Sequence, residues 1–122
     1  MKKILIVDDE KEIRDLIAKK LAQNEYTTLA AASGKEALSI CKTNPPDLIL
    51  LDIAMPEMDG YEICMQLKEE PVTKDIPVLL LTGKDLDPKG IIERYKDTGA
   101  CGYIPKPATF KELLEKIKGV IG

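Results

Sequence analysis

Short, uninterrupted apolar runs alternate with longer amphipathic stretches five times along this chain of 122 residues. The clearest runs are Ile4-Leu5-Ile6-Val7, Leu48-Ile49-Leu50-Leu51 and Val78-Leu79-Leu80-Leu81. Because these runs do not alternate with polar residues, they predict strands buried on both faces, as in a parallel sheet covered by helices. The predicted strands are Lys3–Val7, Thr27–Ala31, Leu48–Leu51, Val78–Leu81 and Gly102–Ile104.

A helix-start signal follows each predicted strand: a capping residue with an acid three residues later in four cases, and with a proline next to it in the fifth. The signals are Asp9 with Glu12, Ser33 with Glu36, Asp59 with Glu62, Asp87 with Pro88, and Thr109 with Glu112. After the first signal, apolar residues recur at helical spacing at Ile13, Leu16, Ile17 and Leu21. Gly99 and Gly119 are suited to helix ends.

Five strands that alternate with five helices predict one α/β domain over residues 1–122, a (βα)5 fold with a doubly wound, five-stranded parallel sheet. In such sheets, sites form outside the carboxyl ends of the strands, near the point where the strand order reverses. In the flavodoxin-like strand order 2-1-3-4-5, the first and third strands are neighbours at that point.

Polar residues gather at these predicted strand ends. Asp8, Asp9 and Glu10 follow the first strand, and Asp52 follows the third. Thr82 follows the fourth strand, and the fifth runs into Lys106-Pro107. Crowded carboxylates repel one another unless a cation joins them, so the cluster predicts a hard, oxygen-binding ion such as Mg²⁺. Carboxylates, metal, hydroxyl and lysine together suit phosphoryl transfer, which depends on positioning and charge neutralisation.

Each of these residues also has an ordinary structural interpretation. Asp9 can cap the first helix, which is compatible with metal binding. Thr82 can simply end a strand, and Lys106 alone is one more surface lysine. Asp52 is different, because the next predicted helix begins near Asp59 and a cap cannot explain an acid that ends a run of leucines. A buried carboxylate without a role is costly, so function is the favoured interpretation of Asp52.

The combination resembles the receiver domains of bacterial two-component response regulators, from Met1 to about Gly119. The matching motifs are the acidic pair Asp8-Asp9, Asp52 in Leu-Leu-Asp-Ile-Ala-Met-Pro-Glu-Met-Asp-Gly, Thr82 before Gly83, and Tyr103-Ile104-Pro105-Lys106-Pro107. Each motif alone is weak, but four motifs on four strand ends make a specific signal.

The resemblance implies that a sensor histidine kinase or a phosphotransfer protein transfers a phosphoryl group to Asp52. It implies that Mg²⁺ is held by Asp9, Asp52 and the backbone carbonyl of Ala54, with Asp8 supporting through water. Lys106 is then expected to pair with a phosphoryl oxygen, and Thr82 and Tyr103 to act as the conformational switch. The surface expected to change comprises the helix after Pro88, the strand Gly102–Ile104 and the helix after Thr109, and a downstream effector protein or domain would bind there. Such a protein assists its own phosphorylation and slow dephosphorylation but turns over no external substrate.

Composition excludes several other classes of function. The 18 basic residues are interleaved with 21 acidic ones for a net charge of −3, and aromatic residues are scarce, which argues against direct nucleic-acid binding. The three cysteines form no C-x-x-C pair, so a disulfide framework or a zinc site is not expected, and reduced thiols fit a cytoplasmic protein. The first apolar run has only four residues before the acids, so neither an export signal nor membrane insertion is expected. With no histidine in the chain, histidine-based hydrolysis and metal ligation are excluded.

Three alternatives stay open at this point. A phosphatase of the haloacid dehalogenase type also uses an aspartate nucleophile and Mg²⁺, but its Asp-x-Asp pattern differs from Asp8-Asp9-Glu10. A degenerate receiver that serves only as an interaction module is disfavoured because every key position is filled. Flavin mononucleotide binding is disfavoured because the loop after the first strand is acidic.

Overall fold

The structure is a computed structural model that describes residues 1–53, 60–82, 99–105 and 109–121. Its centre is a five-stranded sheet in the order β2-β1-β3-β4-β5, and every neighbouring pair is parallel. The strands are β1 (Lys3–Val7), β2 (Thr27–Ala31), β3 (Leu48–Asp52), β4 (Val78–Thr82) and β5 (Gly102–Pro105). The helices in the described ranges are α1 (Lys11–Gln23), α2 (Gly34–Thr43), α3 (Gly60–Glu69) and α5 (Phe110–Ile121). The predicted fold class and strand order are confirmed.

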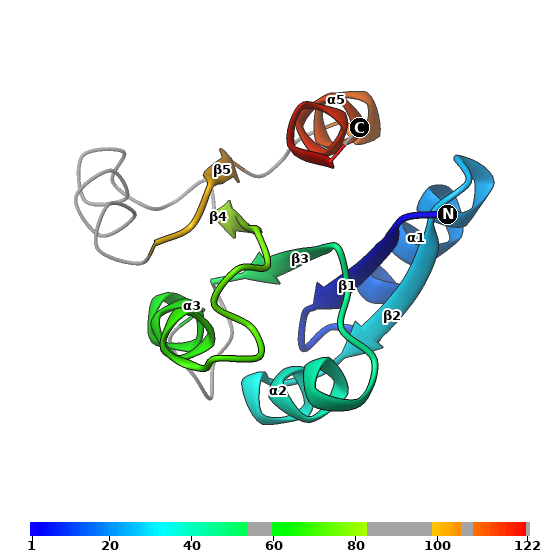
Figure 1. The fold of residues 1–122 in the computed structure, drawn as a ribbon. Helices are drawn as coiled ribbons and strands as arrows, with labels where there is room; N and C mark the ends of the chain where they lie inside the picture. The colour runs from blue at the N-terminus through cyan, green and yellow to red at the C-terminus, as the bar shows by residue number, and fades with distance from the viewer. Residues whose placement is uncertain (54–59, 83–98, 106–108, 122) are drawn as a thin grey trace.

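Helices cover both faces of the sheet, with α1 and α5 on one side and α2 and α3 on the other (Figure 1). Successive residues of a strand point to opposite faces, so each central strand contributes to two apolar cores. Leu5 and Val7 pack in the core that contains α2 and α3, whereas Ile4 and Ile6 pack in the core that contains α1 and α5. All four side chains are fully buried, which confirms that the uninterrupted apolar runs are strands covered on both faces.

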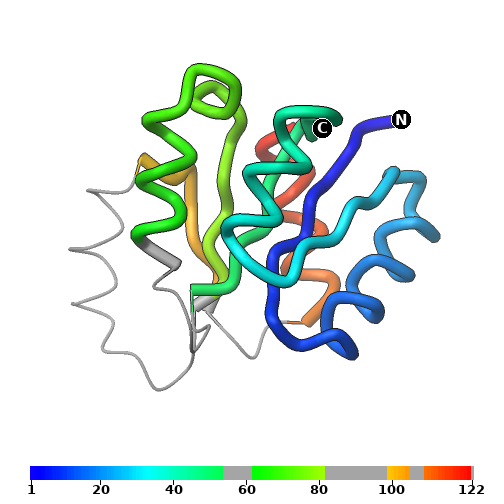
Figure 2. Tube along the Cα trace, turned by 90° about the horizontal axis from the view of Figure 1, so that it is seen from below, coloured from blue at the N-terminus to red at the C-terminus, as the bar shows by residue number. Residues whose placement is uncertain are grey.

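The carboxyl ends of the strands lie at one edge of this sandwich. The N-terminus of the chain and the end of α5 lie at the opposite edge (Figure 2). Two of the predicted caps are confirmed: Ser33 Oγ accepts a hydrogen bond from the Glu36 amide at 3.2 Å, and Thr109 Oγ1 accepts one from the Glu112 amide at 3.1 Å. The signals at Asp59 and at Asp87-Pro88 lie outside the described residues.

The predicted cap at Asp9 is wrong. Helix α1 begins at Lys11, its N-cap residue is Glu10, and that residue makes no side-chain capping hydrogen bond. The Glu10 amide instead donates to Oδ1 of Asp8 at 2.9 Å. The turn after β1 therefore uses the first acid of the pair as the local acceptor, while Asp9 remains exposed.

One further expectation fails for a tertiary reason. Gly119 lies inside α5 and does not end it, because the helix continues to Ile121, which packs against the core shared with α1. Leu16 lies in α1, as its helical spacing predicts, although its side chain is 55% exposed and that of Leu21 is fully buried. Gly99 has a φ of +78°, the left-handed conformation that suits a helix end, but the residues before it lie outside the described ranges. No helix in the described part of the chain is long and apolar enough to cross a membrane.

Candidate functional site

Two neighbouring strands bring Asp8 and Asp52 to the same edge of the sheet. The parallel register pairs Val7 of β1 with Leu51 of β3, so the residues that come next are Asp8 and Asp52. The Asp8 amide donates to the carbonyl of Ala31 in β2 at 3.1 Å, which extends the β1–β2 pairing by one residue. On its other side, Asp52 is in register with Leu81 of β4. The candidate site therefore lies at the point where the strand order reverses, as the sequence predicts.

Three carboxylates come together there. One oxygen from each of Asp8, Asp9 and Asp52 lies within 4.8 Å of the other two. Asp8 is fully buried and Asp52 is 3% exposed, while Asp9 faces solvent. Three negative charges at this separation repel one another, and burial of two of them removes the water that would otherwise screen the repulsion. A bound cation would relieve both costs.

The donor set indicates which kind of cation fits. All three groups are carboxylates, which are hard oxygen ligands, and the described part of the site contains no histidine or thiolate. Such a set suits Mg²⁺ and related hard divalent ions better than zinc or copper. The exposure of Asp9 leaves the cluster open on one side, so a cation and a phosphoryl group could reach it from solvent. The residues present therefore fit the metal that the sequence predicts.

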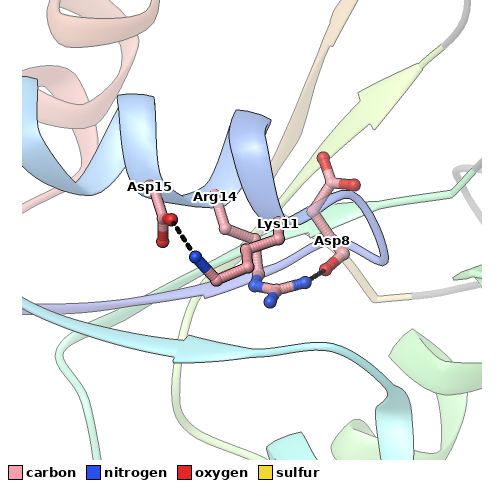
Figure 3. Close-up of polar contacts among 4 residues, drawn as sticks. All are labelled: Asp8, Lys11, Arg14 and Asp15. Carbon is pink, nitrogen blue, oxygen red and sulfur yellow. Dashed lines mark hydrogen bonds and ion pairs between the residues drawn. The ribbon is translucent and has the colours of Figure 1, made fainter.

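The turn between β1 and α1 holds Asp8 by several hydrogen bonds. Besides the bond from the Glu10 amide to Oδ1, Nη1 of Arg14 donates to the backbone carbonyl of Asp8 at 2.8 Å. Figure 3 shows the guanidinium group at this carbonyl, while the Asp8 carboxylate points away from it. Arg14 is not among the site residues predicted from the sequence. Its only sequence signal is a basic residue in the first turns of the helix that follows the acidic pair.

The remaining predicted site residues are described only in part. Thr82 is the last residue of β4, and its backbone is in register with Pro105 of β5. Tyr103 lies in β5 opposite Leu80, is half-buried, and packs against the core that contains α2 and α3. Ala54 and Lys106 lie outside the described residues. The structure therefore brings together Asp8, Asp9 and Asp52. It places Thr82 on β4, next to β3, and Tyr103 one strand further away, on β5.

The sequence pattern of the response regulator receiver domain matches residues 4–118. The chain belongs to the response regulator receiver family. This receiver is 37% identical over 121 residues to the response regulator MprA of Mycobacterium sp. (strain KMS) and 36% identical to that of Mycobacterium avium (strain 104). These alignments cover 98% of the receiver but 50% of each relative, so the chain spans about half the length of the curated relatives it matches.

Solved structures show the same relationship. Chemotaxis protein CheY4 of Vibrio cholerae superposes on the receiver with a TM-score of 0.90 at 31% identity, and the match covers 99% of both chains. The response regulator TrrA of Thermotoga maritima, in a structure with Mg²⁺ and BeF, has a TM-score of 0.83 at 34% identity over 99% of this chain and 100% of its own. Receiver domains are signalling switches of two-component systems rather than enzymes that turn over an external substrate.

Proposed function

We propose that this receiver accepts a phosphoryl group on Asp52 from a histidine kinase or a phosphotransfer protein, with Mg²⁺, and that the modification changes a surface bound by a downstream effector. The observation that carries the proposal is the cluster of Asp8, Asp9 and Asp52, whose oxygens lie within 4.8 Å of one another at the strand ends. In this proposal residues 1–122 form a single receiver domain that acts in the cytoplasm, without binding nucleic acid or inserting into a membrane.

Asp52 is the nucleophile in this mechanism because of its place in the sheet. It ends β3, which lies between β1, the strand that Asp8 follows, and β4, the strand that ends in Thr82. Asp52 is only 3% exposed, so little water competes for the oxygen that reacts. Asp8 is tied to the turn through Oδ1, and Asp9 is exposed, so these two acids are better suited to hold a cation.

In the phosphoryl transfer, a bond from phosphorus to Asp52 replaces a bond from phosphorus to histidine. An oxygen of Asp52 attacks the phosphorus of a phosphohistidine in line with the bond from phosphorus to the imidazole nitrogen. A new P–O bond forms, the P–N bond breaks, and its electron pair stays on the imidazole, which takes a proton from solvent. The product on this chain is an acyl phosphate. Mg²⁺, when bound, neutralises charge on the phosphoryl oxygens.

The residues of this chain then have separate tasks. Asp8, Asp9 and Asp52, with the backbone carbonyl of Ala54, would hold the cation, with Asp8 acting through water as the family resemblance implies. Lys106 would pair with a second phosphoryl oxygen. The hydroxyl of Thr82 would donate a hydrogen bond to the phosphoryl group, and Tyr103 would turn inward. Because phosphorylation favours one of two pre-existing states, these changes shift an equilibrium.

The proposal is tested by incubating the protein with acetyl phosphate and Mg²⁺ and following intact mass. Wild-type protein should gain one phosphoryl group, Asp52→Asn should gain none, and EDTA should stop the reaction. Asp75→Asn is a matched control because it removes an exposed acid in the loop after α3. Uptake by Asp52→Asn at the wild-type rate would contradict the assignment, and an unmodified wild type would favour an interaction module. Sustained turnover of an external phosphomonoester would favour the phosphatase alternative.

A further inference from the structure

Arg14 contacts the peptide group that joins the two acids after β1. Its Nη1 donates to the backbone carbonyl of Asp8 at 2.8 Å (Figure 3). That carbonyl belongs to the peptide bond between Asp8 and Asp9, and a peptide group is planar. A hydrogen bond that fixes the carbonyl therefore fixes the orientation of the whole plane, from which both acids extend.

Two other hydrogen bonds of this turn hold Asp8, the residue on the N-terminal side of that peptide group. The Asp8 amide donates to Ala31 in β2 at 3.1 Å, and Oδ1 of Asp8 accepts from the Glu10 amide at 2.9 Å. The Arg14 amide donates to the Glu10 carbonyl at 3.0 Å, so Arg14 belongs to the first hydrogen-bonded turn of α1. Arg14 therefore connects the rigid start of the helix to the peptide that carries the acids.

The geometry separates this role from simple charge pairing. The Asp8 carboxylate points away from the guanidinium group (Figure 3). A neighbouring cation also repels a metal ion by Coulomb's law, so the charge of Arg14 alone would weaken metal binding. A benefit from Arg14 must come from the orientation that its hydrogen bond gives to the two acids. Partners that orient metal ligands in this way typically change metal affinity about 10- to 100-fold.

We propose that Arg14 is a positioning residue for the metal site, which holds the Asp8–Asp9 peptide so that both carboxylates face the cation. This inference rests on the proposed function, since it assumes that the cluster binds Mg²⁺. It goes beyond that function because it assigns a role to a residue that contacts neither the metal nor the phosphoryl group.

Two substitutions on α1 test the proposal. Arg14→Met removes the donor and one positive charge. Lys11→Met removes an equal charge nearby, from a side chain that is paired with Asp15 at 3.1 Å on the exposed surface (Figure 3). The dissociation constant of Mg²⁺ is measured by following backbone amide shifts near the cluster, after a ¹H–¹⁵N spectrum has shown that each variant is folded.

For Arg14→Met, loss of the positioning hydrogen bond and loss of the positive charge predict opposite changes in the affinity for Mg²⁺. If Arg14 positions the acids, Arg14→Met should weaken Mg²⁺ binding about tenfold, at the lower end of the range for such partners. Lys11→Met should stay within about twofold of wild type or bind slightly more tightly, because exposed charges are screened. Binding by Arg14→Met that equals or exceeds that of wild type would overturn the inference.

Further measurements separate failure of this inference from failure of the proposed function. If Asp9→Ala weakens binding while Arg14→Met does not, only the role of Arg14 is overturned. If the wild type binds no Mg²⁺, both are overturned. Should Arg14→Met fail to fold, hydrogen exchange of the Arg14 guanidinium in wild-type protein replaces it. Because coupling between sites is reciprocal, saturating Mg²⁺ should slow that exchange, and an unchanged rate would overturn the inference.

Discussion

Asp8 and Asp52 come directly after a pair of residues in register, Val7 of β1 and Leu51 of β3, on two neighbouring parallel strands. Both carboxylates are almost completely buried, and an oxygen of the exposed Asp9 lies within 4.8 Å of each. An arrangement that concentrates negative charge in this way lowers stability in the absence of a cation. The receiver therefore exchanges stability for the ability to bind a metal and a phosphoryl group.

We expect Asp52→Asn to raise the free energy of unfolding by about 1–2 kcal/mol in EDTA, because it removes one buried charge from the cluster. Saturating Mg²⁺ should reduce this advantage, since the cation stabilises the wild-type cluster. Urea unfolding with and without Mg²⁺ measures both effects. The exposed Asp75→Asn should stay within about 0.5 kcal/mol of wild type. A less stable Asp52→Asn in EDTA would show that the cluster is not under repulsion.

Most of the fold could be predicted from the sequence, because apolar runs mark the residues that are buried. Burial of those same residues between the helices stabilises the sheet. The predicted strands match β1 and β2 in both of their bounds, and β3, β4 and β5 to within one residue. The error at Gly119 lies where tertiary packing overrides local preference, because α5 continues to Ile121, which packs against the core.

The candidate site could be predicted in part for a similar reason. Asp8, Asp9 and Asp52 follow buried strands, so the strand order alone brings them together. The contact from Arg14 could not be predicted, because it joins a side chain to a backbone carbonyl six residues earlier through an irregular turn. The same turn places Glu10, not Asp9, at the N-cap position, because α1 begins at Lys11.

Two glycines should respond to alanine in opposite directions. A Cβ at Gly34 would lie 2.7 Å from Cγ1 and 3.2 Å from Cγ2 of Ile63 in α3, so rotation of the isoleucine cannot relieve the clash. We expect Gly34→Ala to lower the free energy of unfolding by about 1–3 kcal/mol. Gly119 lies in the exposed last turns of α5, with nothing within 4 Å of an added Cβ.

Gly119→Ala should therefore raise the free energy of unfolding by roughly 0.5–1 kcal/mol, because alanine loses less backbone entropy in a helix. Urea unfolding of both variants measures the difference. Equal effects of the two substitutions would show that the close approach between α2 and α3 is not tight.

Cys41 and Cys101 should react slowly with iodoacetamide at neutral pH. Burial raises the pKa of the Cys41 thiol, and burial likewise raises the pKa of the Cys101 thiol despite the opposing charges of Lys68 and Lys116. A raised pKa leaves less of the reactive thiolate at a given pH. The reaction of the more accessible Cys101 should therefore keep accelerating as the pH rises above about 9.0. A rate that reaches its plateau below that pH would contradict a raised pKa for Cys101. The buried Cys41 should be modified only on unfolding.

Thr82→Ala should separate phosphorylation from switching. We expect this variant to accept a phosphoryl group on Asp52 but to reach the active state poorly. A hydrogen bond from the Thr82 hydroxyl to a charged acceptor contributes about 1.5–3 kcal/mol, which shifts a two-state equilibrium roughly ten- to a hundredfold. Backbone amide shifts in β5 and α5 of the beryllofluoride-treated protein measure the switch. Thr82→Ser, which keeps the hydroxyl, serves as the control, and full wild-type shifts in Thr82→Ala would exclude Thr82 as the coupling residue.

The central claim is that Asp52 is the residue that carries the phosphoryl group, and chemical mapping tests it most directly. Borohydride reduces an aspartyl acyl phosphate to homoserine, so treatment of the phosphorylated protein marks the modified position permanently. Peptide sequencing by mass spectrometry then identifies that position. We predict homoserine at position 52 and at neither of the neighbouring acids, Asp8 and Asp9. Homoserine at position 8 or 9 with an unmodified position 52, or a phosphoryl group that resists borohydride, would contradict the claim.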